Sequence, residues 1–354
     1  MLSSCSDITD SVTDAADEEY AITLMASVSG MERMSSRAAT TYQDTIPSYS
    51  NPLPTDVWLT TQRGVYTHDD EEYVTSTHPG TDTYHYHHTM TYTSGQLTFL
   101  SASAMRNLLL YPVNKNTPTY IVGFYPQGKF QLVGTAADAD YGKTATASFD
   151  GKTDLMFAPE VHGSRKTEEK IARQDYKHIL TWLKICARAD NEDARAYWES
   201  ITGIKLKNTA NSVVVDLSTT DISELHPEFS GSIDMDFDRS AGSGPFTTDS
   251  PYALTTYITE IADILCAPVI INNPSADDAG ATEYQLEIAT KGGGTKTIDI
   301  QFTKDYDNND IADGHYTASE LYVISLAFGQ SPVINASVTL LNWDNENRDL
   351  NMSE

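Results

Sequence analysis

The chain has 354 residues, with 50 acidic and 23 basic side chains and a formal net charge of -27. Such a chain repels phosphate backbones and anionic headgroups, so we expect no nucleic-acid partner and no electrostatic attachment to a membrane. No run approaches the ~20 consecutive apolar residues that a spanning helix needs. A covalent lipid is therefore the route by which this chain would reach a membrane.

The first residues match a lipid attachment signal. Leu2, Ser3 and Ser4 precede Cys5, in the order of a bacterial lipobox. The charged and apolar segments of a signal peptide should stand before this motif, and only Met1 does, so the start is trimmed from a precursor or the match is accidental. The acidic stretch after Cys5 has no apolar period and is typical of a disordered tether. We expect residues 1–18 to be a lipoprotein tether, with the lipid on Cys5.

The next stretch predicts a half-buried strand that ends at Gly30. Alternate residues on one face are apolar, as in a strand with one face on a core. These residues are Ile22, Leu24, Ala26 and Val28. Residues 31–54 have no period and are rich in Ser, Thr and Pro, which indicates a long exposed loop.

Short alternating segments with Gly and Pro turns follow along both halves of the chain. In the first half they are DVWLTT, YHYHHTMTYT, QLTFLSA, PTYIVGFYP, TATASFD and DLMFAPE. In the second half they are YKHILTWLKICARA, ITGIKLKN, SVVVDLST, EYQLEIAT, KTIDIQFT, ELYVISLAF and PVINASVTLLNW. Regular short strands favour an all-β sandwich or barrel over an α/β fold. Residues 103–112 and 250–274 are weaker candidates for short helices.

A charged break, VHGSRKTEEKIARQ, separates the two halves, so we expect one β-sandwich domain over residues 19–163 and another over residues 164–354. The last predicted strand again has one apolar face at every second residue. The residues of this face are Ile334, Ala336, Val338 and Leu340.

The sequence motifs that could bind a metal are incomplete. His85 and His87 would share one face of a strand while His88 faces the other way, so a closed site would need a ligand such as His68 or His78. Asp305, Asp307 and Asn309 stand at the first, third and fifth places of a calcium-binding loop, but Asp310 replaces the expected glycine and Tyr316 the final glutamate. We expect no metal and no cofactor.

Catalytic motifs are equally scarce. No serine lies in a G-x-S-x-G context, and we find no catalytic constellation, so we expect the chain not to be an enzyme. Cys186 and Cys266 could pair in an oxidising periplasm, but nothing about their spacing requires it, and we expect two buried free thiols.

Several segments in order resemble the fimbrillin family, the lipoprotein-derived pilins of type V pili. The segment TDLMFAPE resembles the element that closes the first domain of that family, and YKHILTWLKI resembles the strand that opens the second. YWESITGIKLKNTANSVVVDLST resembles the strand-turn-strand that follows. The terminal segment, DGHYTASELYVISLAFGQSPVINASVTLLNWD, matches best. Residues 246–281 have no part in the pattern.

The resemblance implies two transthyretin-like Greek-key β-sandwich domains in a structural pilus subunit or tip adhesin, on the outer membrane of a Gram-negative cell. It implies export through the periplasm as a lipoprotein, cleavage by a maturation protease and polymerisation with other pilin subunits by donor-strand exchange. A host or bacterial surface receptor is a further implied partner. The membrane would be contacted only through the lipid anchor.

Residues of the chain fit this scheme. Arg37, flanked by small residues in the predicted loop, is the expected cleavage site, and Arg33 is the reserve. Cleavage there would free the first strand and leave an apolar groove with unpaired backbone groups, a template for another strand. The apolar face of the last strand would make it the donor.

Two other functions stay open. The chain could be a surface lipoprotein that never polymerises and binds carbohydrate or a host ligand, with sugars stacking on tyrosines such as Tyr66, Tyr73 and Tyr84. It could also be a secreted hydrolase with a site assembled from distant residues, to which no motif points.

Overall fold

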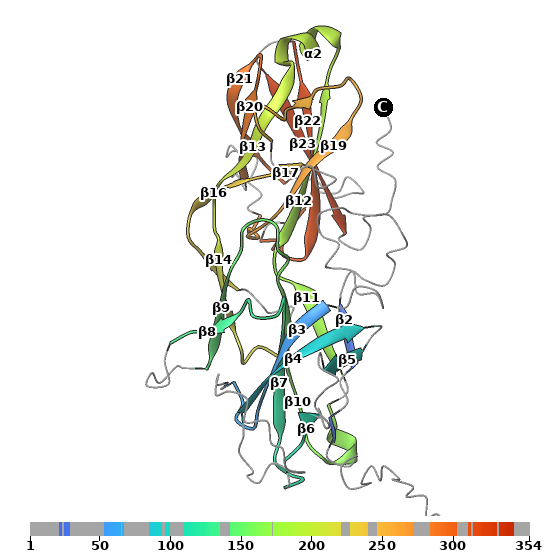
Figure 1. Ribbon diagram of the computed structural model, residues 1–354, viewed down its shortest axis with the longest axis vertical. Coiled ribbons are helices and arrows are strands. Elements are labelled where there is room, and N and C mark those ends of the chain that lie inside the picture. Colours follow the sequence, from blue (N-terminus) through green and yellow to red (C-terminus); the bar gives the residue numbers. More distant parts are fainter. Residues whose placement is uncertain are drawn as a thin grey trace, which may run out of the picture.

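The computed structural model shows an elongated molecule built almost entirely of β-strands (Figure 1). The structure describes residues 21–22, 25–28, 53–64, 66, 85–93, 96–99, 109–112, 114–134, 142–171, 173–220, 227–239, 246–271, 284–302, 311–312, 314–330 and 333–342. Within these residues the expectation of an all-β fold with little helix is confirmed.

Seven strands near one end of the molecule close into a barrel with the order β10-β11-β2-β5-β4-β3-β7. Their bounds are β2 (Met25–Val28), β3 (Leu53–Thr60), β4 (His85–Thr93), β5 (Gln96–Phe99), β7 (Thr119–Tyr125), β10 (Met156–Gly163) and β11 (Arg173–His178). A short pair beside the barrel joins β1 (Ala21–Ile22) to β6 (Leu109–Leu110). A 3-10 turn, η2 (Thr167–Glu169), lies between β10 and β11.

The other end is a sandwich of two sheets. The first has the order β17-β19-β12-β22-β23, and the second β16-β13-β20-β21, with β18 paired to β13. The first sheet comprises β12 (Thr181–Ala189), β17 (Asp238–Arg239), β19 (Thr259–Cys266), β22 (Glu320–Phe328) and β23 (Ile334–Asn342). The second comprises β13 (Ser200–Thr209), β16 (Ile233–Asp236), β18 (Tyr252–Ala253), β20 (Tyr284–Thr290) and β21 (Gly294–Ile300).

A four-stranded sheet, β15-β14-β9-β8, lies between these parts and takes strands from both halves of the sequence (Figure 1). Its strands are β8 (Gln131–Leu132), β9 (Thr144–Ser148), β14 (Ser212–Asp216) and β15 (Glu228–Ser230). Strand β14 pairs with β9 over five residues, and β11 pairs within the barrel although it follows residue 164. The division between residues 163 and 164 therefore stays a prediction, with strand pairing on both sides of it.

A short helix, α2 (Glu192–Trp198), caps the far end of the sandwich. Its first turn is fixed by Asn191, whose side-chain oxygen accepts a hydrogen bond from the Ala194 amide at 2.9 Å. Trp198 at its end is fully buried, with its ring edge-on to Phe328 and its Nε1 donating to the Gly329 carbonyl at 2.8 Å. The helix thus closes the sandwich between β12 and β13.

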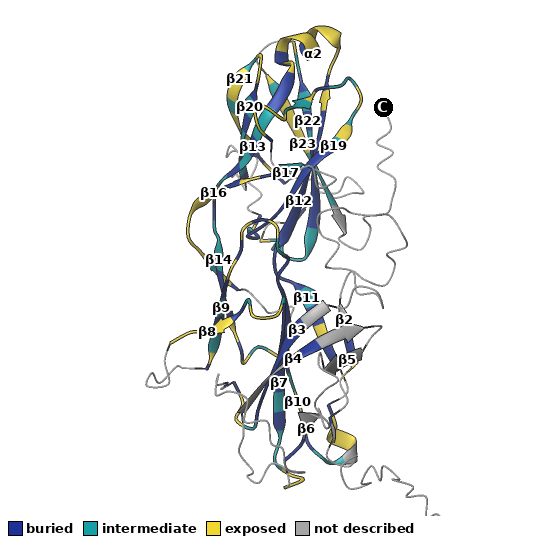
Figure 2. Ribbon diagram, in the orientation of Figure 1, coloured by how far each residue is buried: buried dark blue, intermediate teal, exposed yellow. Residues whose placement is uncertain are grey.

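The buried residues fall into two hydrophobic clusters, and Figure 2 shows the dark blue strands that carry them. The main cluster fills the sandwich and continues past the four-stranded sheet to Trp58 and Phe124, whose ring centroids are 4.6 Å apart. A smaller cluster, the barrel cluster, lies on the opposite face of the same barrel strands. Strand β7 contributes Phe124 to one cluster and Ile121 to the other, so both of its faces are buried and its sequence is nearly continuously apolar.

One predicted strand is divided in the structure. Residues 176–189, predicted as one strand, form the end of β11 and all of β12, and the chain changes sheets at Ile179 and Leu180. The described parts of the first predicted strand, β1 and β2, pair with different partners, and residues 23–24 between them lie outside the described residues. Residues 250–274, a weak helix candidate, form strands β18 and β19 where they are regular.

Candidate functional site

Among the described residues, the first two strands pair with β6, β11 and β5. Strand β2 lies between β11 and β5 in the barrel. It is parallel to β11 over four pairs, from Arg173 beside Met25 to Tyr176 beside Val28. On its other side, among the described residues, Met25 pairs with Gln96 of β5. Strand β2 therefore closes the barrel between β11 and β5.

Where the structure describes them, the side chains of these strands alternate between buried and exposed. Ile22 and Ala26 are each 6% exposed, whereas Met25 is 44% exposed. This is the pattern of a strand with one face on a core. Leu24 lies outside the described residues, and so does the side chain of Val28.

Ile22 and Ala26 belong to the barrel cluster. The other fully buried members come from β3, β4, β7, β10, β11 and the segments beside them. They are Val57, Leu59, Met90, Tyr111, Ile121, Tyr125, Met156, Ala158, Ile171 and Tyr176. Burial of an isoleucine side chain is worth about 1.5–3 kcal/mol. The first strands thus complete a small core that is distinct from the main one.

The barrel interior beside β2 is tightly filled and partly polar. Gln174, the neighbour of Ala26 on β11, is fully buried, and its amide oxygen and nitrogen have no hydrogen-bond partner among the described residues. Tyr176 is also buried there, and a Cβ on Gly123 would collide with its hydroxyl, so β7 needs glycine at this point. Burial raises the pKa of Tyr176.

The last strand, β23, is an edge strand. It pairs antiparallel with β22 over nine residues, from Ile334 beside Phe328 to Asn342 beside Glu320, and it ends the strand order of its sheet. Ile334, Val338 and Leu340 are partly buried against the main cluster. Asn335, Ala336 and Ser337 are exposed. Ala336 therefore contributes less to the apolar face than the alternation predicts.

Other predicted positions lie beyond what the structure describes. Cys5, Arg33 and Arg37 fall outside the described residues, as do His68, His78, Asp305, Asp307 and Asn309. The three histidines at 85, 87 and 88 are in β4, but their side chains are not described. Within the described part of the chain, no three His, Cys, Asp or Glu side chains gather as metal ligands would.

Tyr66 is fully buried, which removes it from the tyrosines that could stack on a sugar. Its hydroxyl donates to Glu160 at 3.1 Å. The same carboxylate accepts from the Gly64 amide at 2.9 Å and from the Arg63 side chain at 3.2 Å. Burial, and next the Glu160 charge, hold the pKa of Tyr66 well above its usual value. This network fixes the segment after β3 onto β10.

Cys186 and Cys266 are both buried free thiols, as expected. They lie on neighbouring strands but out of register, since Cys186 is opposite Glu260 and Cys266 is opposite Thr181. Burial raises the pKa of each thiol to about 12, so neither is a reactive nucleophile.

Sequence reasoning missed Gln174, Glu160 and the helix α2. The helix had a readable signal, because Asn191 is a favoured N-cap residue and two acidic residues occupy the first turn. Gln174 and Glu160 gave no such signal, since their burial depends on pairing between distant strands. The described residues contain no helix that is both long and apolar enough to cross a bilayer.

Comparisons with known proteins place the fold. No protein-family model matches the sequence, and no curated protein does. The crystal structure of a Bacteroides uniformis protein, provisionally described as a cell adhesion protein, has a TM-score of 0.51 with 13% identity. The match covers 91% of this chain and 98% of that one.

Two further solved structures are similar at lower scores. A provisionally described cell adhesion protein from Bacteroides ovatus has a TM-score of 0.49 and 14% identity, over 92% of this chain and 98% of that one. A fimbrial protein from Bacteroides vulgatus has a TM-score of 0.44 and 15% identity, over 91% and 99%. At such identities the similarity shows a shared fold, and the chain has the all-β fold of the B. uniformis protein along nearly its whole length.

Proposed function

We propose that this chain is a structural subunit of a surface fibre, a pilin or tip adhesin, rather than an enzyme. In this proposal it is exported as a lipoprotein anchored through Cys5 and is cleaved after Arg37, or after Arg33. It then polymerises by donor-strand exchange. The fold shared with the B. uniformis protein, whose description is cell adhesion, supports a role at the cell surface.

One observation carries the proposal. Strands β1 and β2 complete the barrel cluster, which is separate from the main cluster that holds the sandwich and the four-stranded sheet. Withdrawal of the first segment therefore opens one small core and leaves the large one in place. The opened site offers the backbone of β11 and β5 as well as an apolar interior, which is what an incoming strand needs.

The last strand is the proposed donor. Among the described residues its partner strand is β22, and its half-buried aliphatic residues would become fully buried in the barrel of a neighbour. An edge strand can be removed without breaking a second ladder, so its release costs less than that of a central strand.

Protease treatment tests the assembly step. Purified Cys5→Ser protein, treated with trypsin and run on gels without boiling, should give ladders. Arg33→Ala/Arg37→Ala should abolish them, whereas Arg188→Ala, at an exposed site on β12, should not. Deletion of residues 332–354 should also abolish ladders, because it removes the donor. A cleaved protein that remains a stable monomer would contradict strand exchange and favour the ligand-binding lipoprotein.

Lipid attachment has its own test. Cells expressing the precursor should incorporate a palmitate analogue into this protein, and the label should be lost in Cys5→Ala. Cys186→Ala is the matched control, because that thiol is buried in the sandwich and should not affect labelling. Labelling that persists in Cys5→Ala would show that Cys5 is not the anchor.

A further inference from the structure

The strand that leaves the barrel and the strand proposed to replace it share a short sequence. Residues 26–28 of β2 read Ala-Ser-Val, and residues 336–338 of β23 read Ala-Ser-Val. The residue two places before each alanine is also aliphatic, Leu24 in one case and Ile334 in the other. Superposed on this match, the two strands carry their apolar residues on the same face.

The surroundings of Ala26 explain why a small residue is needed at the shared alanine. Gln174, its neighbour in the parallel ladder, is fully buried and points into the barrel beside it. Parallel neighbours project to the same side of a sheet, so the Gln174 amide and the side chain at position 26 compete for one space. The adjacent interior is filled by Tyr176, which leaves no room for a Cβ on Gly123. The Ala26 methyl group is buried in this space, and we expect a larger side chain there to overpack it.

We propose that the groove left by β2 accepts β23 of a second copy of this chain, in the same direction as β2, with Ala336 beside Gln174. This inference rests on the proposed function and adds the strand direction and the register. A shift of one residue would turn the apolar face outward. A shift of two would press Ile334 or Val338 against Gln174.

The outward residues fit the same register. Asn335 would take the place of Met25, which is 44% exposed, so a polar side chain would replace an apolar one at a solvent-exposed position. Ser337 would lie beside Asp175, which is exposed on β11. The nine residues of β23 are also enough to pair with all six of β11.

Cysteine pairs on two separate proteins test direction and register together. Parallel neighbours lie at a Cα separation that a disulfide can span, and the native Cys186 and Cys266 are buried. Cleaved proteins carrying Arg173→Cys and Asn335→Cys should give a disulfide-linked dimer after mixing and mild oxidation. Asp175→Cys with Ser337→Cys should do the same. The pair Arg173→Cys with Ser337→Cys, two residues out of register, should not.

The outcomes separate this inference from the proposed function. If cleaved protein forms ladders but only the out-of-register cysteine pair gives a linked dimer, the proposed register is wrong while strand exchange stands. Absence of ladders after cleavage of the protein without new cysteines would overturn both. Because each protein carries one new cysteine, a linked dimer comes only from contact between two copies.

Side-chain size gives an independent check. Ala336→Leu should slow ladder formation about tenfold or more, because the larger side chain overpacks the space beside Gln174. Asn335→Leu, an equally large change that faces outward, should not slow it. Both positions are exposed in the monomer, so both variants should fold. Adding Gln174→Ala to Ala336→Leu should restore the rate of ladder formation. Equal rates of ladder formation for Ala336→Leu and Asn335→Leu would contradict the proposed contact.

Discussion

Nδ1 of His178 and Oδ2 of Asp154 lie 2.6 Å apart, and both side chains are almost completely buried. His178 is the last residue of β11, and the chain enters the other sheet at Thr181. The Ser319 hydroxyl donates to the backbone carbonyl of the same histidine, which ties this point to the segment before β22. The pair therefore anchors the passage of the chain from the barrel to the sandwich.

Asp154→Ala should destabilise the protein, because it leaves the His178 ring nitrogen buried without its partner. The expected loss is about 1–3 kcal/mol in the free energy of unfolding. Urea unfolding followed by tryptophan fluorescence measures it. Asp249→Ala, at an exposed aspartate, is the control and should change the free energy by less than about 0.5 kcal/mol. Equal stability of the two variants would show that the pair contributes nothing.

Ile22→Ala should loosen the barrel cluster while leaving the main cluster unchanged. The lost contacts and the cavity should cost about 2–5 kcal/mol locally. Hydrogen exchange read by mass spectrometry should show faster exchange in β2 and β11, with unchanged protection in β12 and β22. Ile233→Ala, a partly exposed isoleucine on β16, is the matched control. Uniformly faster exchange throughout the chain would mean that the two clusters unfold together.

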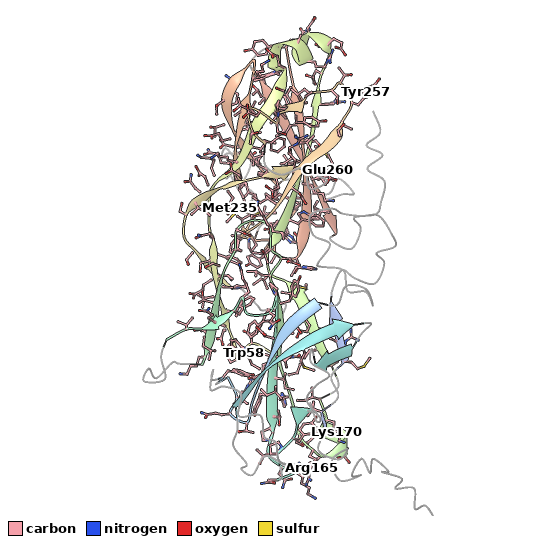
Figure 3. The ribbon with its side chains drawn as sticks, in the orientation of Figure 1. Trp58, Arg165, Lys170, Met235, Tyr257 and Glu260 are labelled. Carbon is pink, nitrogen blue, oxygen red and sulfur yellow. The ribbon has the colours of Figure 1, made fainter. Side chains whose placement is uncertain are left out.

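Tyr66→Phe should cost about 1 kcal/mol, because it removes the hydroxyl that donates to the buried Glu160. Glu160→Ala should cost more, about 1–3 kcal/mol for each donor that it leaves buried without an acceptor. Tyr257→Phe is the control: Tyr257 is 80% exposed and stands at the surface of the sandwich (Figure 3). The double variant Tyr66→Phe/Glu160→Ala should lose less than the sum of the single variants. Strict additivity would contradict the network.

Local patterns predicted most strands but not how the strands pair. Alternation is preserved in β20, where Tyr284, Leu286 and Ile288 are buried and the residues between them are half-exposed. The barrel closes through parallel pairing of β2 with β11, about 150 residues later in the chain, which no short window records. The change of sheet at Ile179 could not be predicted either, because the apolar residues Ile179 and Leu180 lead directly into β12, both faces of which are buried.

At the proposed exchange site, too, the sequence predicts the apolar faces of the strands but not the contacts between them. The apolar faces containing Ile22 and Ile334 could be read from period alone, because a strand exposes every second residue to one side. The need for alanine at position 26 could not, because Gln174 approaches it from another strand. The burial of Tyr66 likewise depends on Glu160, 94 residues away.

His315 predicts a pH dependence of stability. Its Nε2 lies 2.8 Å from both carboxylate oxygens of Glu320, and this hydrogen bond raises the pKa of His315 above its usual value although partial burial lowers it. A raised folded-state pKa means that the contribution to stability is complete below the unfolded pKa, about 6.5, and is lost as pH rises through the folded value. The pair is part-exposed, so its contribution should be about 0.2–1 kcal/mol.

Glu320→Gln should therefore lower the free energy of unfolding at pH 5.5 by more than it does at pH 9. Gln keeps an oxygen that can accept from Tyr322, whose hydroxyl donates to Glu320 at 2.6 Å, so the pH-dependent part of the loss reports on His315. Added salt should reduce the difference at pH 5.5, because screening weakens the attraction between part-exposed charges. Glu228→Gln, at an exposed glutamate of β15, should show no such difference between the two pH values. A loss for Glu320→Gln that is larger at pH 9 than at pH 5.5 would reverse the sign and contradict the assignment of the pair.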